Sequence, residues 1–328
     1  MARDGGAVLT VIIPTLGLRP GMLEDAVRSA LAVLPGAGIE VLVVCNGGAR
    51  DACTLVHERV RFINVAERNG NVARNVGLRH ARGEFVRFLD DDDLLDPSGV
   101  REQLEHMRAL GADISTGAVR HVDARLQEFG RYEPASDDFV VELFEQRGST
   151  MCVAQMFRKG AIAGLQWDPA RGYLQDVDWM HSFIRRGEAH WTPFTGVVGS
   201  WRHHPGWRVS RVGGQSRADM PARDAVAIIA ASISALEAQN RLTPARRQAA
   251  AKALWDYAHA GFRHAPTYWE KVGERALDLD PSSRPEAALL RAWPFSRMAP
   301  ITAEKVLFPL RAVVNGLLEA MPWRIPRP

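Results

Sequence analysis

The chain has 328 residues, of which 46% are hydrophobic and 24% charged, and its formal net charge at pH 7 is +3. This composition is typical of a globular protein that is long enough for two domains. The small net charge argues against nucleic acid as a partner.

The cysteines and the apolar segments indicate the compartment. Cys45, Cys53 and Cys152 show no CxxC spacing, which favours free thiols in a reducing environment. The apolar segment from Val8 to Ile13 is too short for a signal peptide, and no apolar run reaches membrane-spanning length. We therefore expect a cytoplasmic protein.

Strand-like and helix-like segments alternate in the first half of the chain. The buried-type run at 8–13 predicts a strand, and the apolar stripe over 23–34 predicts a helix that ends at Pro35. The same order continues with a strand at 39–44, a helix carrying Leu55 and Val56, a strand at 60–65, a helix at 71–81 and a strand at 85–89. This alternation predicts an α/β fold with a doubly wound, mostly parallel sheet.

Four consecutive aspartates, Asp90 to Asp93, follow the last of these strands. Adjacent like charges raise one another's pKa unless a cation lies among them, and a divalent ion with oxygen preference would relieve the repulsion. On an extended segment Asp90 and Asp92 would point to one side and Asp91 and Asp93 to the other. The alternative is a solvated acidic turn that caps a helix beginning near Pro97. The carboxyl ends of parallel strands are where such sheets bind ligands, which favours the metal interpretation.

The second half of the chain has a different pattern. Short strands at 119–123, 152–157 and 197–202 are mixed with a helix at 176–186, and a Gly-rich linker at 213–216 precedes Ala-rich helical segments. We expect a catalytic domain at 7–212 and a helical C-terminal domain at 217–328.

The C-terminal end carries an apolar stripe between Val306 and Met321, with basic residues and Trp323 nearby. Such a stripe packs on its own domain, forms a homo-oligomer contact, or rests peripherally on the anionic inner face of a membrane. These alternatives stay open.

Five segments in one order resemble the family 2 glycosyltransferases with the GT-A fold. They are VIIPT at 11–15, EVLVVCNG at 40–47, ARNVG at 73–77, GEFVRFLDDDD at 83–93 and QDVDW at 175–179. The resemblance covers roughly residues 8–210 and leaves out the C-terminal helices. It implies an inverting transfer of sugar from a nucleoside diphosphate-sugar to a hydroxyl of a saccharide or lipid-linked saccharide, in synthesis of bacterial-type cell-surface polysaccharide or glycoconjugate.

The resemblance also assigns roles to residues near the aspartates. Asp90 and Asp92 match the DxD pair that binds Mn²⁺ or Mg²⁺, and His204 of the segment Trp201-Arg202-His203-His204 is a further candidate ligand. The donor nucleotide would contact Pro14, Thr15, Arg19, Asn46, Arg74 and Asp91, and the diphosphate would contact Arg202, His203 and Arg208. For Arg74 the alternative is an exposed helix arginine.

Asp176 matches the family's catalytic aspartate, the general base that takes the proton of the acceptor hydroxyl. The preceding position is Gln175 where the family pattern has Glu, and Asp178 is the alternative base. Asp176 also suits the N-cap of the helix that follows, and both roles can coexist.

Two other functions are considered. A nucleotidyltransferase would carry a Gly-rich phosphate loop after the first strand, which Pro14-Thr15-Leu16-Gly17 does not supply. A catalytically silent sugar-nucleotide or carbohydrate-binding module would have no need of Asp90, Asp92 and Asp176.

Overall fold

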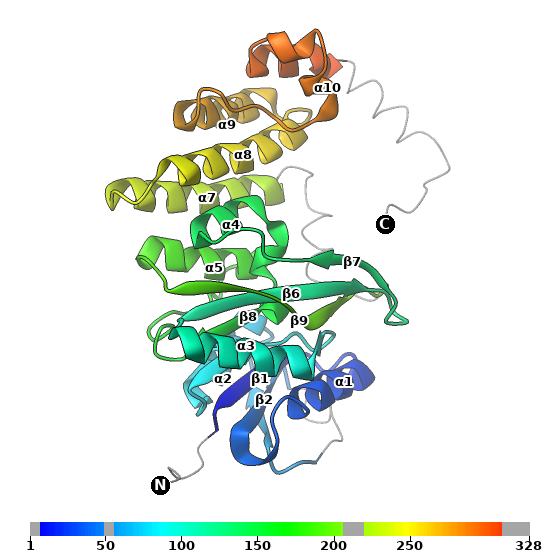
Figure 1. Ribbon diagram of the computed structural model, residues 1–328. Coiled ribbons are helices and arrows are strands. Elements are labelled where there is room, and N and C mark those ends of the chain that lie inside the picture. Colours follow the sequence, from blue (N-terminus) through cyan, green and yellow to red (C-terminus); the bar gives the residue numbers. More distant parts are fainter. Residues whose placement is uncertain (1–6, 49–55, 206–219, 310–328) are drawn as a thin grey trace. The chain divides into compact units, whose positions relative to one another are not determined.

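The computed structural model describes residues 7–48, 56–205 and 220–309. The chain divides into two compact units, Met1–Arg211 and Val212–Pro328 (Figure 1).

The first unit is built on one twisted sheet in the order β3-β2-β1-β4-β8-β6-β9-β5, with β7 paired to β6. The strands are β1 Leu9–Thr15, β2 Ile39–Asn46, β3 Val60–Val65, β4 Phe85–Phe88, β5 Leu94–Leu95, β6 Ile114–Val122, β7 Glu128–Tyr132, β8 Gln155–Arg158 and β9 Trp191–Arg202. The helices are α1 Pro20–Leu31, α2 Gly70–His80, α3 Pro97–Leu110, α4 Phe139–Glu145 and α5 Gln175–Arg186.

The two halves of the sheet differ in pairing. Strands β1, β2, β3 and β4 pair parallel with one another, as the sequence predicts. Beyond β4 the sheet is mixed, because β8 runs antiparallel to both β4 and β6 while β9 pairs parallel with β6. The segment 152–157 starts as a short 3-10 helix, Cys152–Ala154, before it becomes β8.

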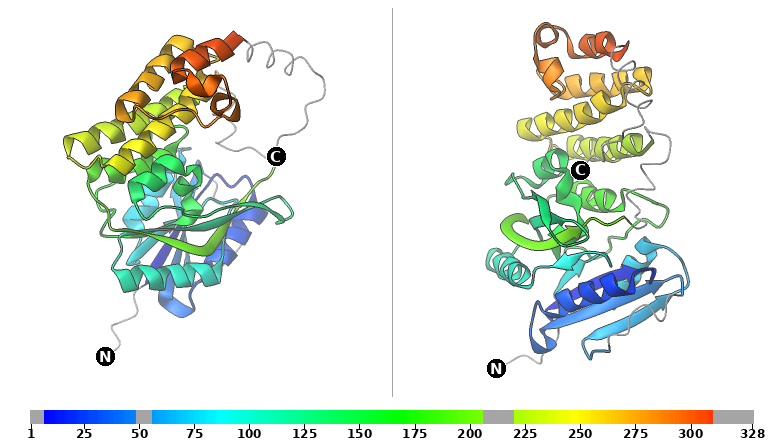
Figure 2. Two further views of the ribbon diagram at one scale, coloured as in Figure 1. Left: turned by 45° about the horizontal axis from the view of Figure 1, so that its top comes forward. Right: turned by 90° about the vertical axis from the view of Figure 1, so that its right-hand side faces the viewer.

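Helices cover both faces of the parallel half, which explains why β1 and β2 are apolar and buried along their whole length. One face packs against α1 and α3 through side chains that include Leu23, Val27 and Leu104. Figure 2 shows α1, in dark blue, lying against the strands at this edge of the sheet. The other face packs against α2, whose Gly77 meets Ile12 and Val44.

Arg87 is the one charged residue of β4, and its side chain is fully buried. Its guanidinium donates to Oε1 of Gln103 at 2.7 Å and to the carbonyl of Val153 at 2.6 Å. Burial lowers the pKa of Arg87 to about 9. These bonds tie β4 and α3 to the backbone beside Cys152.

One predicted element is wrong among the described residues. The helix expected around Leu55 and Val56 is not present at Val56, whose side chain is 97% exposed, and Leu55 lies outside the described residues. The chain there forms a turn, closed by a hydrogen bond from Val60 N to the carbonyl of His57, that leads into β3. A lone apolar pair without a continuing stripe does not require burial.

The second unit is helical. Its elements are α7 Met220–Ala238, α8 Pro244–Gly261, α9 Pro266–Leu279, α10 Ala288–Arg291 and a helical segment at 300–309. Helix α8 packs against both α7 and α9 (Figure 1). Of the C-terminal stripe, Leu307 is buried and Val306 is 47% exposed, whereas 310–321 lie outside the described residues. Among the helices that the structure describes, none has both the length and the apolar character needed to cross a membrane.

The contact of α2 with β1 gives a stability prediction. A Cβ added at Gly77 would lie 2.4 Å from a methyl of Ile12, so Gly77→Ala should lower the free energy of unfolding by about 1–3 kcal/mol. The matched control is Gly21→Ala in α1, where nothing lies within 4 Å of the added atom. It should leave stability unchanged or raise it by up to about 1 kcal/mol. Urea unfolding curves measure both, and equal midpoints for the two variants would contradict the packing.

Candidate functional site

The acidic run lies at the carboxyl end of β4, where the chain turns sharply. The turn is closed by a hydrogen bond of 3.1 Å from Asp93 N to the carbonyl of Asp90. The expected alternation of an extended segment is therefore wrong, because the strand ends before the run begins. The solvated-turn alternative is also wrong, since Asp91, Asp92 and Asp93 are buried and the residue that caps α3 is Asp96.

Three of the four carboxylates form a cluster. Asp90, Asp92 and Asp93 each offer an oxygen, and these oxygens lie within 4.8 Å of one another. Carboxylate oxygens at this spacing are the donor set that Mg²⁺ and Mn²⁺ prefer, so the residues present fit such an ion. Both members of the predicted DxD pair belong to the cluster, and Asp93 joins them.

Asp91 points to the loop that follows β1. Its Oδ2 accepts from the hydroxyl of Thr15 at 2.5 Å, and its Oδ1 pairs with Arg19 at 2.7 Å. The hydroxyl oxygen of Thr15 in turn accepts from Gly17 N. Burial raises the pKa of Asp91 despite these bonds, with a further contribution from Asp92. Asp91 thus contacts both Thr15 and Arg19, and the sequence predicts all three as nucleotide contacts.

Arg74 on α2 balances the charge of Asp90. The two form an ion pair of 2.6 Å, and Arg74 also donates to Oδ1 of Asn71. Its guanidinium lies 4.7 Å from the ring centroid of Trp167. Arg74 is only 4% exposed, so the exposed-arginine alternative is wrong.

The two histidines that follow β9 have different surroundings. Nε2 of His204 lies 2.9 Å from Oδ2 of Asp92 and 3.2 Å from Arg19. The ring of His203 instead packs with Trp201 and Phe129, at centroid distances of 4.2 and 4.9 Å. His204 is therefore in contact with the acidic run.

Arg202 and Arg208 are the basic residues that the sequence predicts as diphosphate contacts. The guanidinium of Arg202 pairs with Asp25 of α1 at 3.2 Å, and only its backbone N–H reaches the acidic run, donating to Asp93 at 2.9 Å. A diphosphate contact by the Arg202 side chain stays a prediction. Arg208 lies outside the described residues.

Asp176 lies in the first turn of α5. The residue at the N-cap position is Leu174, in the left-handed conformation with φ 55°, so the capping role predicted for Asp176 is wrong. Its Oδ1 accepts from Val177 N at 3.0 Å. Burial raises the pKa of Asp176, and the charge of Asp90 adds to this effect while Arg74 opposes it. A carboxylate with a raised pKa is a stronger base.

Asp178, the alternative base, has both carboxylate oxygens in ion pairs. Arg171 pairs with Oδ2 at 3.2 Å and Arg185 with Oδ1 at 2.9 Å. Neither oxygen of Asp178 is therefore free of an ion-pair partner. Gln175 is the first residue of α5.

Asn46 ends β2, which is separated by β1 from the strand that leads into the acidic run. It is 3% exposed, and its Oδ1 has no hydrogen-bond partner among the described residues. Gly47 follows with φ 86°, which turns the chain directly after this side chain. Pro14 lies in β1 beside Val44 of β2. A ligand donor that reached Oδ1 of Asn46 would satisfy a buried acceptor.

Cys152 is a site neighbour that the sequence does not reveal. Burial raises the pKa of its thiol well above the ordinary value, and Asp90 adds to the shift. Arg74 opposes the shift without reversing it. The thiol therefore stays protonated at neutral pH and is a poor nucleophile.

Sequence reasoning also missed the role of the asparagines on α2. Asn69 caps this helix by accepting from Asn71 N and Val72 N, while Asn71 and Asn75 lie one turn apart and are buried. Asparagine is unfavourable inside a helix, so two of them at this spacing were a signal for side-chain bonds to another segment.

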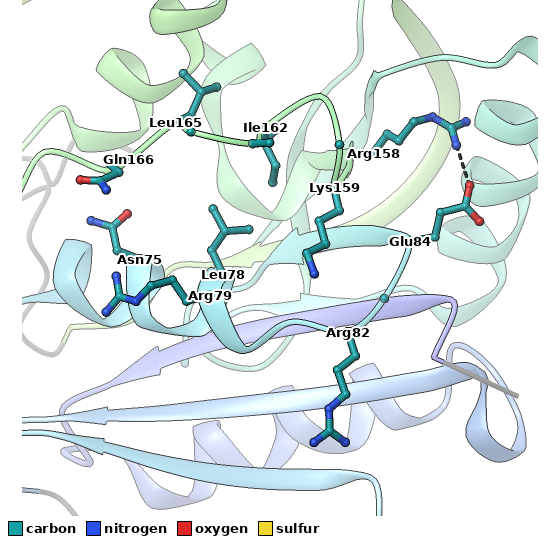
Figure 3. Close-up of a pocket in the computed structure, with 14 residues that line it drawn as sticks. Asn75, Leu78, Arg79, Arg82, Glu84, Arg158, Lys159, Ile162, Leu165 and Gln166 are labelled. Atoms are coloured by element: carbon teal, nitrogen blue, oxygen red, sulfur yellow. Dashed lines mark hydrogen bonds and ion pairs between the residues drawn. The ribbon is translucent and has the colours of Figure 1, made fainter.

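A cavity of about 700 Å³ lies between α2 and the segment that follows β8 (Figure 3). Its walls combine apolar side chains such as Leu78 and Ile162 with cations such as Arg79 and Lys159. None of the carboxylates of the acidic run lines it, and neither does Asp176. The cavity is therefore distinct from the predicted site, although Asn75 lies at its edge.

Comparisons with known proteins agree with this geometry. The family model "Glycosyl transferase family 2" matches residues 10–179, just over half of the chain. The succinoglycan biosynthesis protein ExoW of Rhizobium meliloti is 31% identical over 148 residues, which are 42% of this chain and 46% of ExoW. The match spans about half or less of the length of these curated relatives.

Solved structures show the same fold. TarS 1-349 of S. aureus, in complex with UDP-GlcNAc, has a TM-score of 0.56 at 14% identity over 94% of this chain and 92% of that chain. The mannosyltransferase PcManGT from Pyrobaculum calidifontis, in complex with GDP-Man and Mn²⁺, has a TM-score of 0.51 at 17% identity over 96% and 91% of the two chains. The predicted GT-A type α/β fold is confirmed.

The carboxylate cluster predicts metal affinity. Asp92→Asn should weaken Mn²⁺ binding at least about tenfold, since even residues that only orient metal ligands are worth that much. Asp91→Asn is the matched control in the same turn, because its oxygens contact Thr15 and Arg19, and it should weaken binding less. Calorimetric titration with MnCl₂ measures both. Equal affinity of Asp92→Asn and the parent protein would contradict the assignment.

Proposed function

The chain belongs to glycosyl transferase family 2, and we propose that it is an inverting glycosyltransferase that uses a nucleoside diphosphate-sugar. One observation carries the proposal. A carboxylate cluster suited to a divalent ion and a separate carboxylate of raised pKa interact electrostatically at the carboxyl end of the sheet. Such a transfer needs these two groups, because charge develops on a leaving diphosphate on one side while a proton leaves the acceptor on the other.

The leaving-group side consists of the acidic run and its cations. Asp90, Asp92 and Asp93 would hold Mn²⁺ or Mg²⁺, which when bound supplies Lewis-acid neutralisation of the diphosphate. Arg19 and His204 lie against Asp92, and we propose that they donate to phosphate oxygens there.

Asp176 is the proposed general base. In an inverting transfer one carboxylate takes the proton of the acceptor hydroxyl as that oxygen attacks the anomeric carbon from the face opposite the diphosphate. The bond from the anomeric carbon to the diphosphate oxygen breaks in the same step, and the electron pair leaves with the nucleoside diphosphate. We prefer Asp176 to Asp178 because both oxygens of Asp178 are in ion pairs with arginines.

The nucleotide is proposed to bind along the ends of β1 and β2. Thr15, Arg19 and Asp91 form one connected group there, and Asn46 contributes a buried amide one strand further. An amide offers both a donor and an acceptor to a base edge. TarS and PcManGT were solved with UDP-GlcNAc and with GDP-Man, so both uridine and guanosine nucleotides are candidates for this chain.

The acceptor is proposed to be a hydroxyl of a saccharide or a lipid-linked saccharide. ExoW and ExoO are named as succinoglycan biosynthesis proteins, which supports a role in surface polysaccharide or glycoconjugate synthesis. A catalytically silent binding module is the less favoured alternative, because it gives no reason for a separate carboxylate of raised pKa beside the cluster.

A donor screen tests the proposal. We expect the purified protein with MnCl₂ to release nucleoside diphosphate from one or more of the UDP-, GDP- and dTDP-sugars, at a slow rate with water as the acceptor. Asp176→Asn should lower this rate by about 100- to 10,000-fold, because it removes the proton acceptor. Binding of the nucleoside diphosphate should persist in this variant. Turnover by Asp176→Asn at the parent's rate would reject the base, and binding without turnover by the parent would favour the silent module.

The raised pKa of Asp176 predicts the pH dependence of the reaction. The base must be ionised, so kcat/KM should fall as the pH falls through the pKa of Asp176. Because that pKa is raised, the midpoint of this fall should lie above the ordinary aspartate value of about 3.9. Initial rates across a pH series measure it, and a midpoint at or below 3.9 would contradict the assignment.

A further inference from the structure

Two asparagines of α2 and the asparagine that caps this helix hold the segment 167–171, nearly a hundred residues away in the sequence. Asn75 forms a reciprocal pair with the backbone of Trp167, donating to its carbonyl and accepting from its N–H, both at 2.8 Å. Asn71 donates to the carbonyls of Asp168 at 2.7 Å and Arg171 at 3.0 Å.

Asn69 adds a bond of 2.8 Å from its side-chain amide to the carbonyl of Pro169. Figure 3 shows Asn75 pointing toward the segment at Gln166. The held segment has no regular secondary structure of its own, since residues 161–174 between β8 and α5 form turns and irregular backbone. Its backbone carbonyls therefore depend on side chains or water for hydrogen bonds, and the asparagines supply several of them.

The held segment leads directly into the base. Three residues after Arg171 the chain reaches Leu174 in the left-handed conformation, and α5 then begins with Asp176 in its first turn. The same helix that holds the segment also holds the leaving-group side, because Arg74 pairs with Asp90 at 2.6 Å. Helix α2 thus contacts the acidic run and the connection to Asp176 within two turns.

We propose that Asn71 and Asn75 are positioning residues, which fix the location of Asp176 relative to the carboxylate cluster. This inference rests on the proposed function, since it assigns the two side chains a purpose in that reaction. Both act on the base through the backbone of 167–171. Asn71 also accepts a hydrogen bond from Arg74, which pairs with Asp90, so Asn75 gives the cleaner test. The loss of Asn75 should affect the chemical step and leave donor binding intact.

The test compares Asn75→Ala and Asn71→Ala with the parent protein, using whichever of the UDP-, GDP- and dTDP-sugars the parent turns over. We expect kcat to fall by about 10- to 100-fold in each variant, because small displacements of a catalytic group cost that much. In Asn75→Ala the KM for the donor should stay within about twofold, and so should the affinity for Mn²⁺ measured without nucleotide. The split between kcat and KM distinguishes positioning from loss of donor binding, and the stoichiometry of the Mn²⁺ titration measures the fraction of folded protein.

The matched control is Thr10→Val, which keeps the side-chain shape at the amino end of β1. It removes two buried hydrogen bonds, from Thr10 to Glu40 and from Gly83 N to Thr10, far along the strand from the acidic run. Thr10→Val should lower stability without changing kcat. If Asn75→Ala retains the kcat of the parent, or loses kcat and Mn²⁺ affinity together, the positioning role is wrong. A parent protein without turnover would overturn the proposed function instead.

Discussion

Repulsion among four adjacent carboxylates is the constraint on which the rest of the site depends. Each aspartate of the run has a partner. Asp90 meets Arg74, Asp91 meets Thr15 and Arg19, Asp92 meets His204 and shares Arg19, and Asp93 accepts from the backbone of Arg202. These partners come from α2, from the end of β1 and the loop after it, and from the end of β9. The run therefore joins elements that are distant in the sequence. The strand order of the sheet brings these elements together, and they supply the partners that offset the repulsion among the carboxylates.

Helix α2 has a second role beside its packing on the sheet. One face carries Gly77 against β1, which allows the close approach of the helix to the strands. Three further side chains of α2 bind other segments. Arg74 is bound to the acidic run, and Asn71 and Asn75 are bound to the chain before α5. A rigid element that is bonded in both directions keeps two separate groups in register. In this domain a rigid helix supplies the precise placement that a loop alone would not.

The parallel half of the fold was predictable because buried strands and amphipathic helices leave periodic patterns, and the segment from Val8 to Leu89 shows them. The acidic run and Asp176 were recognisable as a motif. The direction of each side chain was not, since it depends on a turn that begins directly after β4 and on partners more than a hundred residues away, such as Arg202 for Asp93. The pairing of Arg202 with Asp25 and the burial of Cys152 near the carboxylates are likewise tertiary outcomes that no local pattern encodes.

The aromatic packing beneath Arg74 has a spectroscopic consequence. Trp167 and Trp179 stack with their rings at 4.7 Å and 2° from parallel, and Phe88 closes the group edge-on. Two indoles held so close in a fixed orientation couple their electronic transitions, and the near-ultraviolet circular dichroism of a protein depends on such fixed aromatic packing. One of these rings belongs to the segment held by α2 and the other to α5. The protein thus contains a native optical reporter, which responds to the joining of these two elements without any attached label.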